Sequence, residues 1–202
     1  MISCSLPKRS IGTYIFWIIS FFITITAIRL FHECMHGVFS VLTGGEFGSI
    51  YVIDWILSFY PIFAISCSGG NPFIVTEGTL IVTWVVALII AIVTSYPFLS
   101  CFTDPCSAAN LSFKLFGVRI GAVFEMFGQA VYAMPNFILW YENDIVPGDG
   151  TYMYQLFENI GYPGDFQYII AFAMLIGALF TLYWSIKCDP EVCGSCRVWY
   201  GG

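Results

Sequence analysis

Charged residues are scarce in this chain, at 10% of 202 residues, whereas hydrophobic residues make up 58%. A soluble domain has about 25% charged residues, so this chain has too few charges to cover a water-facing surface. Lys and Arg number only seven and form no patch, and the net charge is -6, which argues against nucleic acid as a partner. Linkers, internal repeats and low-complexity segments are also lacking in the sequence. The composition therefore indicates one integral membrane domain over residues 1–202, in contact with the lipid bilayer.

Four apolar segments are long enough to cross a hydrocarbon core of about 30 Å, which requires about 20 helical residues. The first begins after Lys8 and Arg9. It is much longer than the core of a signal peptide, so we interpret it as a retained helix. We therefore expect an all-α membrane protein with about four transmembrane helices. The predicted spans are approximately 11–42, 76–100, 116–141 and 166–187.

The segment 43–75, between the first two predicted spans, differs from the rest of the chain. Its stretches 47–53 and 62–67 are rich in β-branched and aromatic residues and are bounded by turn residues. We predict a small sheet or re-entrant hairpin, which a membrane tolerates where protein or a water-filled cavity satisfies the backbone. A fifth span over 51–66 is the alternative, although an aspartate and a proline lie inside it.

The motif His32-Glu33-Cys34-Met35-His36 matches the pattern H-E-x-x-H in an apolar, helical background. Residues four apart share one helical face, so both imidazoles can bind one Zn²⁺ ion. Glu33 is then placed to take a proton from water as the general base. The chain has only two histidines, and both belong to this motif. Because ionisable side chains are costly inside a membrane, the motif favours a functional site over histidines that only satisfy hydrogen bonds within the bundle.

A catalytic zinc site usually has three protein ligands, so two histidines leave one ligand to be found. Asp149, followed by Gly150 beyond the third predicted span, is the first candidate, and Asp144 is the second. Either residue could instead be a solvated turn aspartate, because Asp-Gly is a common turn pair. Both lie in a predicted polar loop over 142–150, and a short interfacial helix is predicted over 152–160.

These motifs together resemble the site-2 protease family of intramembrane zinc metalloproteases. The resemblance covers about residues 15–157, but the H-E-x-x-H motif and the downstream Asp-Gly pair carry nearly all of it. It implies that His32, His36 and Asp149 are the zinc ligands and that Glu33 is the general base. It also implies that the substrate is a transmembrane segment of another membrane protein.

One departure from the family lies at the start of the second predicted span. The family often has Gly-Pro followed by Asn there, whereas this chain has Glu77-Gly78-Thr79. The polar helper of the transition state is therefore not identified, and Asn71 and Asn143 are the substitutes that the sequence offers. The alternative function is a non-catalytic metal-binding subunit, or pseudoprotease, of a larger membrane complex. A transporter is less favoured, because paired half-helices and an internal repeat are lacking.

The charges predict an orientation in the membrane. Counting turns places the zinc motif and Asp149 on one face, together with seven other acidic residues and no Lys or Arg. The positive-inside rule predicts that the opposite, basic face, which includes both termini, is cytoplasmic. The family resemblance implies instead a site nearer the cytosol. The basic face has every basic residue except Arg29, namely Lys8, Arg9, Lys114, Arg119, Lys187 and Arg197.

Arg29 lies three residues before His32 and hence on the same side of the first helix. A charge within a span requires compensation, so we expect Arg29 to pair with Glu125 or Glu33. Stabilisation of an oxyanion is the alternative role.

Six of the eight cysteines fall on the basic face. Four thiolates drawn from five of them could bind a structural zinc that joins the loop after the second span to the tail 188–202. Disulfides are the better interpretation if this face is extracytoplasmic, and unligated surface thiols are the third possibility. The five cysteines are Cys101, Cys106, Cys188, Cys193 and Cys196.

Overall fold

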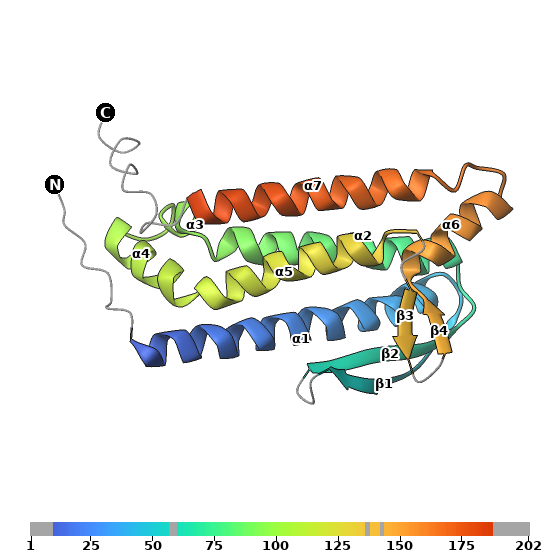
Figure 1. Ribbon diagram of the computed structural model, residues 1–202, viewed down its shortest axis with the longest axis horizontal. Helices are drawn as coiled ribbons and strands as arrows, with labels where there is room; N and C mark the ends of the chain where they lie inside the picture. The colour runs from blue at the N-terminus through green and yellow to red at the C-terminus, as the bar shows by residue number, and fades with distance from the viewer. Residues whose placement is uncertain (1–9, 57–59, 136–137, 142–143, 188–202) are drawn as a thin grey trace.

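The computed structural model describes residues 10–56, 60–135, 138–141 and 144–187 of the chain. Within these ranges, four long helices form a bundle in which the central helix α5 contacts the other three (Figure 1). Three of them, α1, α2 and α7, are long and apolar enough to cross a membrane. The long helices are α1 (Ile11–Leu42), α2 (Pro72–Val93), α5 (Phe116–Tyr132) and α7 (Phe166–Lys187).

Side chains cap the first two long helices at their starts. Ser10 Oγ accepts a hydrogen bond from the backbone N–H of Thr13 at 3.3 Å and begins α1. Asn71 Oδ1 accepts from the backbone N–H of Phe73 at 3.0 Å, and Pro72 occupies the first position of α2, where no N–H is needed. The starts of α1 and α2 are therefore fixed by local sequence.

Small residues fill the contacts between the helices, while large apolar residues lie outside. Two buried clusters hold the bundle together and are rich in alanine, which lets helix backbones approach closely. The outer faces of α1 and α7 expose isoleucine and phenylalanine, as a lipid-facing surface requires. This arrangement, with three helices of spanning length, is that of a membrane protein. Exposed examples are Ile11, Ile23, Ile169, Ile176 and Phe180.

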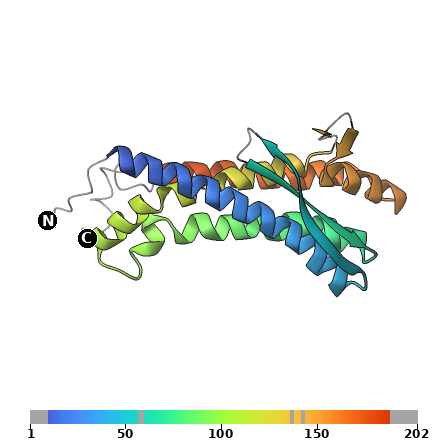
Figure 2. The same cartoon turned by 90° about the horizontal axis from the view of Figure 1, so that it is seen from below.

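The segment after α1 forms an antiparallel hairpin of β1 (Glu46–Ile56) and β2 (Tyr60–Ser68). The hairpin lies across the second half of α1 (Figure 2). Gly37 allows this close approach, because a Cβ there would overlap the ring of Phe47 and crowd Ile65. The predicted sheet is confirmed, and the alternative of a fifth span over 51–66 is wrong, because the described residues 51–56 and 60–66 belong to two paired strands.

The predicted second span, 76–100, is wrong at its C-terminal end. Helix α2 ends at Val93, and a separate short helix, α3 (Tyr96–Leu99), follows. Pro97 has no N–H to donate to the Val93 carbonyl, so the helix cannot continue through it. Helix α4 (Pro105–Lys114), which the sequence analysis did not anticipate, then leads into α5.

The predicted third span, 116–141, also ends too late. Helix α5 stops at Tyr132, because Pro135 would leave the i−4 carbonyl without a donor. The rest of the predicted span contains β3 (Ile138–Tyr141), which pairs with β4 (Asp144–Pro147). The predicted polar loop is thus partly a strand.

Helix α6 (Asp149–Asn159) follows β4 and confirms the predicted short helix over 152–160, although it begins earlier. Consequently Asp149 is the first residue of a helix and not part of a free turn. The ends of α1 and α5, the starts of α2 and α7, both hairpins and α6 gather at one end of the bundle (Figure 1). Counting turns in the sequence predicted this grouping.

Candidate metal centre

Three predicted ligands converge at this end of the bundle. The Nε2 atoms of His32 and His36 are 3.1 Å apart. Each of them lies 3.4 Å from Asp149 Oδ2. The side chain of His32 is 6% exposed, that of His36 11% and that of Asp149 19%. Among the described residues, these three are the group whose ligand atoms are close enough to hold one metal ion.

Two different local structures bring the ligands together. His32 and His36 are one turn apart on α1, so their rings stack edge to face with centroids 4.8 Å apart. Asp149 comes from the start of α6, more than a hundred residues later. Gly150 sets that start, because a Cβ at this position would overlap the carbonyl group of Ala133 at the end of α5. The Asp-Gly pair therefore packs tightly against α5.

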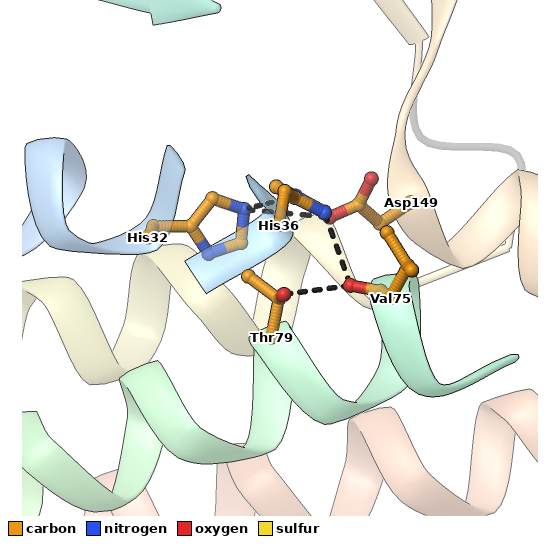
Figure 3. Close-up of polar contacts among 5 residues, drawn as sticks. All are labelled: His32, His36, Val75, Thr79 and Asp149. Carbon is orange, nitrogen blue, oxygen red and sulfur yellow. Dashed lines mark hydrogen bonds and ion pairs between the residues drawn. The ribbon is translucent and has the colours of Figure 1, made fainter. Parts of the chain in front are cut away.

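A backbone carbonyl orients one of the two histidines. His36 Nδ1 lies 3.1 Å from the carbonyl oxygen of Val75 in the first turn of α2, which also accepts from Thr79 Oγ1 at 2.6 Å (Figure 3). A carbonyl oxygen can only accept, so His36 Nδ1 must donate its proton to it. In the neutral ring this leaves the Nε2 lone pair directed at His32 and Asp149. Such second contacts are typical of metal-binding histidines.

Two of the three converging atoms, His36 Nε2 and Asp149 Oδ2, are acceptors, and His32 Nε2 faces both of them. The His36 Nε2 lone pair, His32 Nε2 and a carboxylate oxygen point toward one another, as Figure 3 shows. Among the described residues, Asp149 Oδ2 has no hydrogen-bond partner. His32 Nδ1 also has no partner in this part of the chain, so a proton on His32 Nε2 or a cation would satisfy the acceptors that face it. The donor set of two imidazoles and one carboxylate is one that zinc uses in catalytic sites.

The spacing of the three atoms fits a tetrahedral ion. Zinc bonds of 2.0–2.2 Å to nitrogen and oxygen place neighbouring tetrahedral ligands about 3.4 Å apart. The observed separations are 3.1, 3.4 and 3.4 Å. One tetrahedral position would remain for a further ligand, as in catalytic zinc sites. The residues present therefore fit Zn²⁺ in both chemistry and spacing.

The charge state of Asp149 suits a ligand. Burial opposes its ionisation, but the adjacent imidazoles of His32 and His36 outweigh burial and hold the pKa of the Asp149 carboxyl well below its ordinary value. Asp149 is thus a carboxylate at neutral pH, which is the form that binds a cation.

Glu33, the predicted general base, lies beside this group. It is half-buried on α1, next in sequence to His32 and within electrostatic range of His36 and Asp149. Desolvation and then the Glu33 charge raise the pKa of the Cys67 thiol on β2, so Glu33 also lies near the hairpin.

Arg29 forms the ion pair that the sequence predicted, and its partner is Glu125. Arg29 Nε lies 3.0 Å from Glu125 Oε1 on α5, with the glutamate side chain fully buried. Tyr132, which the sequence analysis missed, stacks edge to face on His32 with centroids 6.1 Å apart. No sequence pattern singles out this residue among twelve tyrosines.

The other candidates from the sequence lie elsewhere. Asp144 is in β4, where its backbone pairs with Tyr141, and its side chain is outside the described part of the chain. Asn71 serves as the cap of α2. Asn143 is outside the described residues. The Val75 carbonyl was not foreseen either, because any residue provides a carbonyl and the sequence carries no signal for it.

The predicted cysteine cluster divides into different chemical states. Cys101 is a free, exposed thiol, whereas Cys106 takes part in a disulfide. A disulfide sulfur is not a thiolate ligand, so Cys106 follows the disulfide interpretation and Cys101 that of a surface thiol. The three remaining members, Cys188, Cys193 and Cys196, lie outside the described residues.

The chain matches no known family model, no curated protein and no solved structure. The chemical interpretation of the centre therefore rests on the geometry described above and on the motifs in the sequence.

Proposed function

We propose that this protein is a membrane-embedded zinc metalloprotease of the site-2 type, which hydrolyses peptide bonds in membrane-protein substrates. The observation that carries the proposal is the convergence of His32 Nε2, His36 Nε2 and Asp149 Oδ2 at 3.1 to 3.4 Å. These residues would hold Zn²⁺, and the motif supplies Glu33 beside them. A glutamate next to two histidine ligands is the arrangement that metalloproteases use for hydrolysis.

The roles of the residues follow from their positions. When bound, zinc supplies Lewis acidity, which activates water and polarises a peptide carbonyl. Glu33 takes a proton from the attacking water and later gives it to the leaving amine as that bond breaks. His36 is kept in the ligating tautomer by its hydrogen bond to the Val75 carbonyl. The Arg29–Glu125 pair compensates charge one turn away from His32.

We further propose that α5 is a fourth transmembrane helix. Its 17 residues extend about 26 Å, a little less than the hydrocarbon core. However, it lies between the three spanning helices, which cover it on several sides (Figure 1). The site would then lie near one membrane surface, where water and an extended segment of substrate both have access.

Two measurements on the detergent-purified full chain test the proposal. Zinc content by elemental mass spectrometry should be one ion per chain in the wild type, and His32→Ala and His36→Ala should remove it. Hydrolysis of an added transmembrane peptide should be lost in Glu33→Gln, which should still bind zinc. Wild-type protein without zinc would refute the metal centre. A chain that binds zinc but shows no hydrolysis in reconstituted membranes would instead support the metal-binding subunit.

We also propose that the end bearing Lys114 and Lys187 faces the cytoplasm, by the positive-inside rule. Arg119 does not contribute to this face, because it is 1% exposed within the bundle. The disulfide at Cys106 favours the opposite orientation, since disulfides persist in oxidising compartments.

Labelling of two free, exposed thiols at opposite ends of the bundle would show which end faces the cytoplasm. Cys101 lies at the end with α3, and Cys67 lies in the hairpin at the site end. A membrane-impermeant maleimide on intact cells should label Cys67 and spare Cys101, with single Cys→Ser variants identifying the labelled residue. Labelling of Cys101 alone would reverse the assignment.

A further inference from the structure

A second buried acid lies near the centre and takes no part in the chemistry described so far. Glu77, in α2, is 2% exposed. Neither of its carboxyl oxygens has a hydrogen-bond partner within 3.5 Å among the described residues. Its neighbour on α7 is Gln167, which is fully buried, whose amide N–H faces the Glu77 carboxyl as a donor, and whose Oε1 has no partner there. Two polar groups are thus buried side by side with unsatisfied oxygens.

A single proton resolves this pair. An ionised carboxylate without a donor or cation is very costly inside a membrane protein. A carboxylic acid, in contrast, donates one hydrogen bond, and the Oε1 of Gln167 is an acceptor beside it. A protonated Glu77 therefore satisfies its own hydroxyl group and the Gln167 oxygen together.

The other side of the Gln167 amide leads to the metal centre. Gln167 Nε2 donates to the carbonyl oxygen of Ala133 at 3.1 Å. Ala133 is the C-cap residue directly after α5, and Gly150 packs against its carbonyl group. Gly150 directly follows Asp149. The position of the Ala133 carbonyl therefore determines where the Asp149 carboxylate lies.

We propose that Glu77 and Gln167 are positioning residues for the metal centre. Glu77, as a neutral carboxylic acid, donates a hydrogen bond to Gln167 Oε1. Gln167 Nε2 donates to the Ala133 carbonyl, against which Gly150 packs next to Asp149. The inference rests on the proposed function, because it assigns Asp149 as a metal ligand. It adds α7 to the elements that build the centre, although no residue of α7 is a ligand.

The test measures Zn²⁺ affinity of the full chain in detergent, by competition with a chromophoric chelator. Glu77→Gln should bind within about threefold of wild type, because an amide replaces the acid as donor. Glu77→Leu and Gln167→Leu should bind at least about tenfold more weakly, as for the loss of other supporting contacts. Thr181→Val is the matched control, because Thr181 is a buried polar residue four turns along α7, and it should bind as wild type does.

The exchange Glu77→Gln/Gln167→Glu sharpens the test. If the carboxyl group is protonated, the exchanged pair keeps every donor and acceptor and should restore affinity to within about threefold of wild type. Infrared spectra should show a carboxylic acid carbonyl band that disappears in Glu77→Gln. This band reports the protonation of Glu77 directly, whereas the zinc affinities of the variants report its positioning role.

Several outcomes would overturn the inference. A Glu77→Gln variant as weak as Glu77→Leu would show that a charged Glu77 is required. Unchanged affinity in folded Glu77→Leu and Gln167→Leu would show that the pair does not position Asp149. If the wild type binds no zinc at all, the proposed function fails first. The infrared band would then still show whether the acid and amide form the pair, while their positioning role for a metal would be refuted.

Discussion

The two ends of the bundle differ in the kind of buried polar contact that they contain. At the end with α3 and α4, donors meet acceptors: Arg119 Nη1 donates to Ser112 Oγ at 2.7 Å, and Trp17 Nε1 donates to the Phe113 carbonyl at 2.9 Å. At the other end, two imidazole nitrogens and a carboxylate oxygen face one another. Complementary pairs need nothing further to be stable, whereas converging acceptors need a cation or protons. On the proposed function, the first end contributes stability and the second binds a ligand.

This difference predicts how each end responds to mutation. Changes at the metal end should alter zinc binding more than stability. Changes at the α3 and α4 end should alter stability and leave zinc binding intact. The four predictions below test this separation.

Gly150→Ala should cause the largest of the four effects, a loss of zinc affinity. The added Cβ would overlap the Ala133 carbonyl group, so the start of α6 must shift and carry Asp149 away from the histidines. We expect zinc affinity to fall by about 100-fold, as for the loss of an essential supporting contact. Gly128→Ala is the control, because a Cβ there meets its nearest atoms at ordinary distances of 3.6 and 3.7 Å. Equal affinity in both variants would show that Asp149 is not held by this contact.

Arg29→Met should affect stability instead, although Arg29 is only one turn from His32. The change leaves the fully buried Glu125 without its cation. We expect thermal unfolding in detergent to report a loss of about 3 kcal/mol, because an unpaired buried charge remains. The double variant Arg29→Met/Glu125→Gln should recover most of the loss, and both variants should bind zinc. Loss of zinc in the double variant would show instead that Arg29 belongs to the metal centre.

Local signals in the sequence were sufficient for part of the metal centre. The four-residue spacing of His32 and His36 determines their common face on any helix, so one short motif predicted their convergence. Turn residues around 43–75 likewise predicted the hairpin. In both cases the residues are close in the sequence, so helix or strand periodicity determines their relative positions.

Contacts between distant segments were predictable only where charge singled out a partner, as for Arg29 with Glu125. The placement of Asp149 depends on Gly150 packing against the end of α5, and the tautomer of His36 depends on a backbone carbonyl in α2. Neither contact has a sequence signature. The ends of α2 and α5 were placed too late because hydropathy continues past Pro97 and Pro135, although each proline removes a helical donor.

A smaller effect on stability is expected for Trp17→Phe. The change removes the hydrogen bond to the Phe113 carbonyl, which joins α1 to α4, and keeps most of the aromatic packing. Unfolding should report a loss of about 1 kcal/mol, with zinc affinity unchanged. Trp84→Phe is the matched control, because the Trp84 indole N–H has no partner among the described residues. A larger loss for Trp84 than for Trp17 would contradict this hydrogen bond as the cause.

The smallest expected effect is a pH-dependent fall in melting temperature when Asp104 is replaced. Asp104 caps α4 through hydrogen bonds from Ser107 and Cys106, which hold the pKa of its carboxyl below the ordinary value of 3.8. A lowered pKa means that this contribution is complete above about pH 4 and is lost as the pH falls through the folded-state value. Asp104→Ala should therefore lower the melting temperature at pH 7 by a few degrees at most, and the difference should shrink below about pH 4. Asp104→Asn, which keeps a capping oxygen, should melt near the wild type at pH 7. If Asp104→Ala also weakened zinc binding, the two ends would be coupled, and the separation between a stabilising end and a ligand-binding end would fail.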